Sequence, residues 1–574
     1  MSLWTRCSSE LLAKLISQFC TENLLQPVDN RLDLGNVSYT FTATRGAFGS
    51  FRVAADSVRR TTAGILGNEE SEVATDPVQF LVDAADVLGL DGSTVAGYVA
   101  ELTSTLAADV RMASSAVSND ELLELHHSRL EGHLTGHPLL VANKGRLGFS
   151  AEDSLRYAPE ARTPLRLVWL AVRRGLAEFR GTPDLSEHSV VGRELGPDVL
   201  EAFRAQLVDP DAYVWLPCHP WQLDHVVRTQ WARELAGGEI VLLGEGPDEY
   251  LPTQSIRTMV NISQPLRYQV KLPLKILNTS VYRGIPEHCT LAAPMITQWL
   301  RGLWYRDEVL KQLGTELLGE VASVTVRHPQ LSSAPGIPYQ WTETLGCIWR
   351  DPVDPRLQQG ETVWPLAAVL HPGFAECLIE RSRVEPRDWI GHLLSALLRP
   401  LLHLMHHYGI TVNPHGENLA VICGPDGVPA RIVIKDLVDD INVSTEQVIA
   451  RGIEPDSHVR VLPRKPWHIL RQYLVDALLL GVLNPLADAG LLPADEFWGM
   501  IRGEIELYAK TFPAYDDRLA ATDLLGETFA RYPLNGYRLT LGYADLDTRP
   551  PIPTTGRISN PLHTAKPIPP RTPW

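Results

Sequence analysis

The stretch K-L-P-L-K-I-L-N-T-S-V-Y-R, from Lys271 to Arg283, has strand-like character. Side chains two residues apart point to the same face of a strand, so Lys271, Thr279, Val281 and Arg283 would share one face. Such a strand would present two cations and a hydroxyl to a single cleft. We therefore expect a sheet here with a polar, positively charged face.

A second short motif, S-I-R-T at Ser255 to Thr258, lies within about thirty residues of this whole stretch. An enzyme that uses ATP needs cations and hydroxyl groups around the triphosphate, where each charge-assisted hydrogen bond contributes roughly 1.5 to 3 kcal/mol. Ser255, Arg257, Lys271 and Arg283 are residues of the right kind. Each motif by itself is more often a solvated strand edge, and it is their co-occurrence that favours the nucleotide interpretation.

The segments N-P-H-G-E-N (Asn413 to Asn418) and K-D-L-V-D-D (Lys435 to Asp440) form a further cluster. The pattern predicts a helix ending at Gly409, then a loop, a strand, a turn and a second strand. Asn418 and Asp436 would supply hard oxygen ligands for Mg²⁺ beside the imidazole of His415. The layout resembles a kinase catalytic loop and its metal aspartate. The alternative is an ordinary turn rich in Asn, Pro and Gly.

Composition limits the partners of the chain. It has 574 residues, of which 44% are hydrophobic, and a formal net charge of -16. That length predicts several cores and an enzyme-sized protein. The negative charge disfavours nucleic acid and anionic membranes as partners, because both reward a basic surface. The clustered Lys and Arg residues are therefore expected to serve a small molecule.

Cysteine usage and the N-terminus predict a cytoplasmic location. The seven cysteines are odd in number, are far apart and form no C-x-x-C pair, which indicates reduced thiols. The first fifteen residues interleave charges with apolar residues and lack a signal-peptide core. Apolar runs such as Ala477 to Leu483 are too short to span a bilayer.

The coarse order of elements predicts an α+β protein. Helical patterns such as Val78 to Leu90 dominate the first 125 residues, and short apolar strands follow at Val214 to Gln222 and Glu239 to Leu243. Helices return from about Asp388. The last 26 residues contain eight prolines and should run extended, either draped over the body or loose.

One more motif completes the set: G-H-P-L-L-V-A-N-K-G-R-L-G-F at Gly136 to Phe149. In order and spacing, the five motifs resemble the signature of the siderophore synthetases that work without nonribosomal peptide synthetases, the aerobactin synthetase (IucA/IucC) family. The resemblance covers roughly residues 130 to 445. It implies a cupped-hand fold, with a helical thumb (1–125), fingers with a β-sheet (126–345) and a mostly helical palm (346–574).

The resemblance also implies roles for individual residues. His137, Thr279 and Arg283 are similar to carboxylate-handling residues of the family, and Asn418 and Asp436 to its metal ligands. The expected nucleotide contacts are Ser255, Arg257, Thr258, Lys271, His415 and Lys144.

The chain departs from the family pattern at several positions. Leu140 and Val141 stand where the family has a second His-Pro pair, and Asn413 stands where it has Glu. Glu417 replaces the usual Gln, and Lys435 the usual Arg. These departures leave open whether the substrate or the metal geometry differs from that of the family.

The activity that the resemblance implies is an ATP- and Mg²⁺-dependent ligation. A polycarboxylic acid, citrate in the first place, would form an acyl adenylate with loss of pyrophosphate, and an amine or hydroxyl would then open it. The acid could instead be 2-oxoglutarate or a citryl intermediate. The identity of the nucleophile and the formation of a homodimer are not determined by the sequence. Two other classes also remain: an amide ligase or kinase outside siderophore metabolism, and an inactive binding homologue.

The histidines His403 and His407 offer a separate metal hypothesis. They stand four residues apart on a predicted helix and could ligate zinc, but the sequence shows no H-E-x-x-H motif and no third ligand. A role at the helix surface or between helices is the favoured interpretation.

Overall fold

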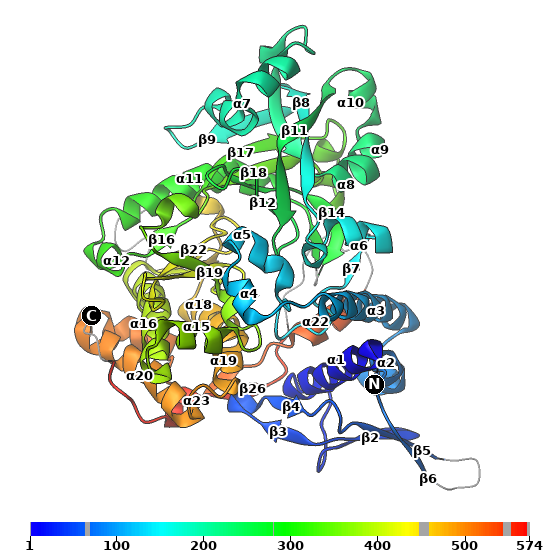
Figure 1. The fold of residues 1–574 in the computed structure, drawn as a ribbon, viewed down its shortest axis with the longest axis vertical. Coiled ribbons are helices and arrows are strands. Elements are labelled where there is room, and N and C mark those ends of the chain that lie inside the picture. The colour runs from blue at the N-terminus through cyan, green and yellow to red at the C-terminus, as the bar shows by residue number, and fades with distance from the viewer. Residues whose placement is uncertain (1, 64–68, 279–280, 447–458, 543–552, 571–574) are drawn as a thin grey trace.

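The structure, a computed structural model, describes residues 2–63, 69–278, 281–446, 459–542 and 553–570. An upper body carries a large sheet, and two lower bodies lie beneath it, with the N-terminal helices on one side and the C-terminal helices on the other (Figure 1). Both helices and antiparallel sheets are prominent, which confirms the predicted α+β class.

The large sheet has eight strands, and every neighbouring pair in it is antiparallel. Helices α7 (Glu187–Arg204) and α11 (Glu287–Trp304) pack against it. The predicted strands at Val214 and Glu239 are confirmed. In sheet order the strands are β10 (Tyr213–Cys218), β8 (Leu165–Arg173), β11 (Ile240–Pro252), β12 (Thr258–Asn261), β13 (Gln269–Lys271), β18 (Gly346–Arg350), β17 (Glu320–Val326) and β9 (Ala177–Gly181).

The sheet continues past residue 345, where the sequence placed the end of the fingers. Strand β18 lies between β13 and β17, inside the sheet, although it comes some seventy-five residues after β13 in the chain. The sheet therefore takes its central strands from distant parts of the sequence.

The prediction of one strand from Lys271 to Arg283 is wrong. Strand β13 ends at Lys271, and Pro273, which has no N–H to donate, separates it from β14 (Leu274–Asn278). Strand β15 (Val281–Arg283) then folds back antiparallel on β14, and β7 (Arg146–Leu147) completes a small three-stranded sheet. Lys271 and Arg283 thus stand on different strands. Thr279 lies outside the described residues.

The N-terminal body is less helical than predicted. Helices α1 (Leu3–Thr21), α2 (Pro77–Leu88) and α3 (Gly92–Ser114) are accompanied by a four-stranded sheet. Its strands are β1 (Arg31–Leu34), β2 (Val37–Thr40), β5 (Arg59–Ala63) and β6 (Glu69–Val73). Every residue of β6 is exposed, so its sequence E-E-S-E-V shows no apolar alternation that would indicate a strand.

The C-terminal body follows the predicted order closely. Helix α16 (Pro386–His403) continues through η8 (Leu404–Tyr408) and ends at Gly409, whose φ of 68° is left-handed. After the loop, β21 (Leu419–Cys423) and β22 (Pro429–Ile434) pair antiparallel. They belong to a four-stranded sheet with β16 (Glu316–Leu317) and β19 (Thr362–Pro365).

One helical run, Trp467–Asp488, has the length and composition of a membrane span. It joins α18 (Trp467–Tyr473), η10 (Leu474–Leu483) and α19 (Asn484–Asp488), and is thus much longer than the apolar run Ala477 to Leu483 suggested. However, 67% of its most apolar window is buried inside the protein, as in the core helix of a folded domain.

The N-terminal and C-terminal bodies are tied together by Glu22. This residue caps the C-terminus of α1, and its carboxylate accepts hydrogen bonds from the backbone N–H groups of Asn535 (3.0 Å) and Gly536 (2.9 Å). These groups belong to the first turn of α22 (Leu534–Leu541), where a negative charge is favourable.

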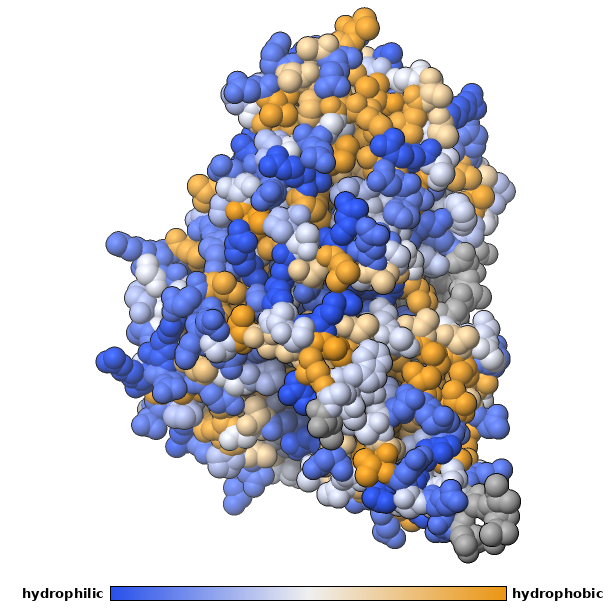
Figure 2. Space-filling view, turned by 45° about the vertical axis from the view of Figure 1, so that its right-hand side comes forward, coloured by the Kyte–Doolittle hydropathy of each residue, from blue (hydrophilic) through white to orange (hydrophobic). Residues whose placement is uncertain are grey.

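Figure 2 shows hydrophilic residues gathered across the middle of one face of the molecule, and hydrophobic residues nearer its top and lower right.

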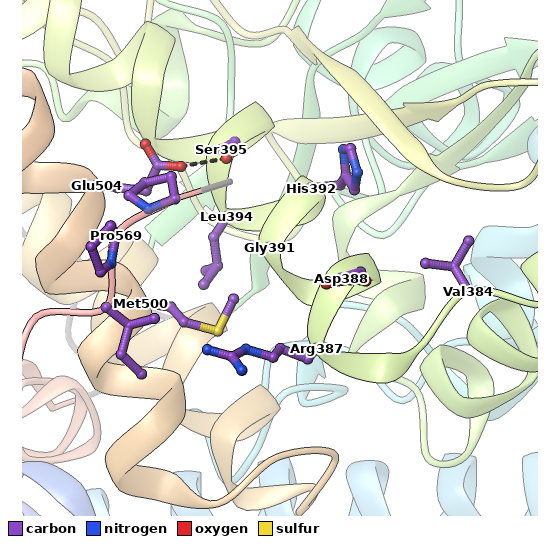
Figure 3. A pocket seen from close by; sticks show the side chains of 12 residues that line it. Val384, Arg387, Asp388, Gly391, His392, Leu394, Ser395, Met500, Glu504 and Pro569 are labelled. Carbon is purple, nitrogen blue, oxygen red and sulfur yellow. Dashed lines mark hydrogen bonds between the residues drawn. The ribbon is translucent and has the colours of Figure 1, made fainter. Parts of the chain in front are cut away.

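The proline-rich C-terminal segment is draped over the body as far as it is described. Residues 566–570 cross the groove between α16 and α20 (Ala494–Thr511), where Pro569 lies near Met500 and Glu504 (Figure 3). The N–H of Ile568 donates to the carbonyl of Gly499 (2.9 Å). A Cβ atom at Gly503 would lie 1.9 Å from the Ile568 carbonyl oxygen, so this glycine lets the segment approach the helix.

Gly503→Ala should therefore detach the segment, with a net cost of about 1 to 3 kcal/mol in the free energy of unfolding from overpacking. Helix propensity alone favours alanine over glycine in a helix interior by about 1 kcal/mol. A loss of stability in this variant would therefore come from the clash with the segment. The measurement is thermal unfolding together with limited proteolysis of the C-terminus. Gly192→Ala in α7, whose Cβ would find only Leu200 at 4.0 Å, is the control and should be neutral or stabilising. Equal behaviour of the two variants would contradict this account of the segment.

Candidate active site

A cavity of about 230 Å³ lies where the large sheet meets the C-terminal body. We call it the central cavity. It brings together residues from β15, from the turn before β12, from the loop before β21 and from the segment after β22. Among its lining are six residues predicted from the sequence: Ser255, Arg257, Arg283, His415, Asn418 and Asp436.

Lys271 lies behind the lining of this cavity, in contact with Asp436 and Asp439, and its side chain is only 1% exposed. Its Nζ atom is 2.6 Å from Asp436 Oδ1 and 2.6 Å from Asp439 Oδ2. Although burial opposes the shift, the cations of Lys271 and Arg350 lower the pKa of Asp436 to about 2. The same carboxylates raise the pKa of Lys271 against the effect of its burial. The lysine and its two aspartates are therefore charged at neutral pH.

Two further buried residues complete the charge network, and the sequence analysis missed both. Arg350 Nη2 lies 3.2 Å from Glu320 Oε1 and 3.4 Å from Asp436 Oδ1. The other Glu320 oxygen accepts the backbone N–H of Val438 (3.0 Å), which fixes the segment after β22 to the sheet. Glu320 and Arg350 stand in apolar strands, E-V-A-S-V-T-V and G-C-I-W-R, where no motif marks them.

The turn that carries Ser255 and Arg257 places both on the cavity wall. Ile256 between them has a left-handed φ of 63°. Arg257 Nη2 pairs with Asp439 Oδ2 (2.9 Å), and its Nη1 donates to the carbonyl of Gly284. Thr258, the first residue of β12, is buried and does not line the cavity.

The loop before β21 fixes the orientation of its polar side chains. His415 Nδ1 accepts the backbone N–H of Glu417 (3.1 Å), so a neutral ring carries its proton on Nε2 and can donate there. Asn418 Nδ2 donates to Asp440 Oδ2 (2.7 Å), which leaves Asn418 Oδ1 as an acceptor. Ala367 Cα would lie 3.1 Å from a Cβ atom at Gly416, so α14 (Leu366–Val369) packs closely against this loop.

The segment K-D-L-V-D-D contributes three carboxylates to one cavity: Asp436, Asp439 and Asp440. Asp436 is held with a left-handed φ of 67°. Burial and the nearby Asp436 charge raise the pKa of Asp440, which accepts the amides of Asn413 (3.0 Å) and Asn418. The sequence motif contains Asp439 and Asp440, but their roles could not be read from it. Hard oxygen atoms crowded in this way fit a divalent cation such as Mg²⁺.

His137 of the first motif lies beside the central cavity without lining it. Its half-buried ring accepts the N–H of Leu139 at Nδ1 (3.3 Å). Burial lowers its pKa to about 3, with smaller contributions from the nearby His415 and Lys14. His137 is therefore neutral at physiological pH and close enough to His415 to interact with it.

Lys144, also predicted to contact the nucleotide, does not reach the central cavity. Its ammonium group pairs with Asp109 (2.9 Å) and donates to the Thr135 carbonyl (2.6 Å). These groups line a different cavity, of about 330 Å³, next to α1. Its position therefore gives no support to the predicted nucleotide contact.

The structure supplies the third group that the sequence could not show for the His403 and His407 pair. Asp307 Oδ2 lies 3.1 Å from His403 Nε2 and accepts the hydroxyl of Tyr408 (2.8 Å). His407 Nε2 lies farther from it, at 3.9 Å. Asp307 is the N-cap of α12 (Glu308–Leu313), so this cluster connects α12 to α16, as the interhelix interpretation predicted.

Comparison with known proteins assigns the chain to a family. Residues 126–371 match the family described as "IucA / IucC family", and residues 387–547 match one described as "Ferric iron reductase FhuF-like transporter". The rhizobactin siderophore biosynthesis protein RhbF of Rhizobium meliloti is 36% identical over 98% of this chain and 96% of its own length. An aerobactin synthase of Escherichia coli is 30% identical, over 95% of each chain.

Solved structures show the same fold. Aerobactin synthetase IucC from a hypervirulent Klebsiella pneumoniae aligns with a TM-score of 0.84 and 26% identity, over 98% of this chain and 99% of that one. The ATP-bound aerobactin synthetase IucA from the same pathotype aligns with a TM-score of 0.76 and 16% identity, over 98% and 99%.

The similarity to RhbF and to aerobactin synthase spans nearly the whole chain, and the fold is that of IucC. The protein is therefore a member of the IucA/IucC family of siderophore synthetases, which are ligases of siderophore biosynthesis.

Proposed function

We propose that this ligase uses ATP and Mg²⁺ to condense a polycarboxylic acid, citrate in the first place, with an amine or hydroxyl nucleophile. The observation that carries the proposal is the central cavity itself. Its lining holds the cations Arg257 and Arg283, with Lys271 behind it, next to a cluster of oxygen ligands. Cations for phosphates and oxygens for a metal ion are what a nucleotide with its Mg²⁺ requires.

Charge balance explains why both the cations and the oxygen ligands are needed. Two unit charges 4 Å apart interact by about 4 kcal/mol at an effective dielectric constant near 20. A triphosphate beside a polycarboxylate brings several negative charges together, so fixed cations must offset their repulsion. Arg257, Lys271 and His415 are suited to the phosphates, because they offer N–H groups from three different elements. The resident aspartates hold Arg257 and Lys271 in place until the nucleotide binds.

The metal ion would be held by Asn418 Oδ1, Asp436 and Asp440. When bound, it would supply positive charge for the phosphate oxygens and relieve the repulsion between the two carboxylates. The amides of Asn413 and Asn418 orient Asp440 toward this position. Asn413, which departs from the family's glutamate, thus tethers Asp440, and this favours a working site over an inactive homologue.

The reaction that we propose has two steps. A carboxylate oxygen of the acid bonds to the α-phosphorus of ATP while the bond to pyrophosphate breaks. The nucleophile then bonds to the acyl carbon, loses its proton, and AMP leaves. Arg283 on the cavity wall is suited to orient the acid. His137, as a neutral imidazole, can accept a hydrogen bond or a proton nearby. A role for Thr279 in binding the carboxylates of the acid remains a prediction.

The alternatives differ in substrate and product. A 2-oxoglutarate or citryl-intermediate substrate would use the same cavity, whereas a kinase or another amide ligase would release ADP instead of AMP and pyrophosphate. We further propose that the protein works in the cytoplasm on small molecules, without nucleic acid or membrane partners, and a homodimer stays open.

Pyrophosphate release is the first test. With Mg-ATP and hydroxylamine as a small nucleophile, citrate should stimulate release more than 2-oxoglutarate or succinate. Arg283→Ala should lower the rate by about 100-fold, as expected when a charged group that orients the reacting acid is lost. Arg228→Ala, at a half-exposed pair with Asp224, is the matched control and should keep the wild-type rate. Release of ADP, or no acid-dependent release in the wild type, would reject the proposal.

A second test separates metal binding from folding. Asp440 pairs with no cation among the described residues, and its buried charge is disfavoured by Asp436. Asp440→Asn should therefore change the free energy of unfolding by no more than about 1 kcal/mol, the worth of one hydrogen bond. Turnover should nevertheless fall by about 100-fold, and the Mg²⁺ concentration needed for half-maximal rate should rise. Asp211→Asn on the surface controls for the substitution. Unchanged Mg²⁺ dependence would remove Asp440 from the metal site.

A further inference from the structure

Two adjacent histidines, His126 and His127, open helix α5 (His127–Leu130), and both rings face one carboxylate from a distant part of the chain. His126 Nε2 lies 2.8 Å from Asp354 Oδ1, and His127 Nε2 lies 3.1 Å from Asp354 Oδ2. Asp354 begins η7 (Asp354–Arg356), in the connection between β18 and β19. We call these three residues the His-Asp cluster.

The distances within the His-Asp cluster fit a small divalent ion. One ligand atom of each residue lies within 4.8 Å of those of the other two. Zinc bonds to imidazole nitrogen and carboxylate oxygen at about 2.0 to 2.2 Å, so the ligand atoms of a tetrahedral zinc site lie about 3.3 Å apart. Small rotations of the three side chains would therefore bring their ligand atoms to one ion.

A hydrogen bond on the far side of the His126 ring suits the ring to bind a metal ion. Its Nδ1 atom lies 2.7 Å from Ser128 Oγ. When Nε2 binds the ion, the ring proton moves to Nδ1 and donates to this hydroxyl. Metal-binding imidazoles are commonly oriented by such a hydrogen bond from the second ring nitrogen. Ser128 can thus hold the ring in the tautomer that ligates.

The carboxylate of Asp354 is not engaged by a permanent cation. Within the described ranges, its ion pairs are those with the two imidazoles. Arg356, two residues further along, pairs instead with Asp351 (3.2 Å). One carboxylate cannot compensate two imidazolium groups, and two positive rings with centroids 4.2 Å apart would repel each other. Neutral imidazoles beside an ionised carboxylate are the ligands that zinc prefers, which favours a metal ion over a simple ion pair.

The cluster of Asp307 with its two histidines, the other such group among the described residues, lacks this freedom. Asp307 already accepts the hydroxyl of Tyr408 (2.8 Å) and the backbone N–H of Leu310 (2.8 Å). In the His-Asp cluster, by contrast, the side chain of His126 is 43% exposed. An ion can therefore enter from solvent, and water can complete its coordination.

The His-Asp cluster joins two segments that lead to the central cavity. Just beyond α5, Glu131 accepts the backbone N–H of Gln254 (2.7 Å), which precedes Ser255 of the cavity wall. On the other side, Asp354 comes four residues after Arg350, which belongs to the buried charge network. An ion that ties the two segments together would therefore support the cavity from outside it.

We propose that His126, His127 and Asp354 form a structural binding site for one divalent transition-metal ion, Zn²⁺ in the first place. The ion replaces the two hydrogen bonds to Asp354 with metal–ligand bonds and fixes α5 to the connection between β18 and β19. It is distinct from the Mg²⁺ of the proposed reaction, because Mg²⁺ prefers hard oxygen ligands and the His-Asp cluster offers two nitrogens.

Zn²⁺ titration of the full chain, in competition with a chromophoric chelator, tests the proposal. An excess of Mg²⁺ keeps the oxygen ligands of the central cavity occupied. The wild type should bind one Zn²⁺ per chain, and Zn²⁺ should raise its midpoint of thermal unfolding. His127→Gln should weaken Zn²⁺ binding at least tenfold, because glutamine keeps an N–H donor for Asp354 but has no imidazole nitrogen. His188→Gln, at an exposed position of α7, is the matched control and should bind like the wild type.

Three outcomes would overturn the proposal. A folded wild type that binds no Zn²⁺, or equal Zn²⁺ binding by His127→Gln and the wild type, would remove the site. Loss of Zn²⁺ binding in His403→Gln, with His127→Gln unaffected, would place the ion beside Asp307 instead. The titrations contain neither ATP nor acid, so their result is independent of pyrophosphate release, which tests the proposed function.

Discussion

The buried ion pairs around Lys271 are the constraint on which the rest of the structure depends. Lys271, Glu320 and Arg350 come from three strands of the large sheet, and Asp436 and Asp439 come from the C-terminal body. Removing one partner from such a network leaves a buried charge uncompensated, which typically costs 3 to 5 kcal/mol. The network thus holds two bodies together at the point where the central cavity opens.

The same charges explain how the cavity can be both stable and reactive. The aspartates compensate Lys271 and Arg257, so the cations are kept in place although they are buried. A nucleotide with its metal ion would exchange these contacts for new ones of the same kind, phosphates for the cations and metal for the carboxylates. Each buried charge would keep a partner of opposite sign, and this limits the desolvation cost of binding.

The first motif has a wider structural role than its sequence suggests. His137 lies next to His415 of the central cavity, Lys144 pairs with Asp109 in the cavity beside α1, and Leu139 lines a third cavity, of about 520 Å³, beside η10. One short segment therefore borders three cavities. Leu140 and Val141, where the family has a second His-Pro pair, make this segment more apolar: Val141 is fully buried, and its N–H donates to Asn535 (2.9 Å).

The sequence by itself determined the α+β class, the helix ending at Gly409, the two strands after it and six of the residues that line the central cavity. Local signals suffice for these, because glycine stops, strand patterns and polar loop residues are visible in short windows. It did not determine that Pro273 and a hairpin divide Lys271 from Arg283, or that the exposed residues of β6 form a strand.

Only the tertiary structure decided which groups meet. Glu320 and Arg350 stand in apolar strands far from the motifs, Asp307 joins His403 from about a hundred residues away, and Asp354 meets His126 and His127 across more than two hundred residues. Lys144 has the residue type of a phosphate contact and yet pairs elsewhere. The physical reason is that burial, pairing and cavity walls arise from contacts between segments distant in sequence, which residue spacing does not encode.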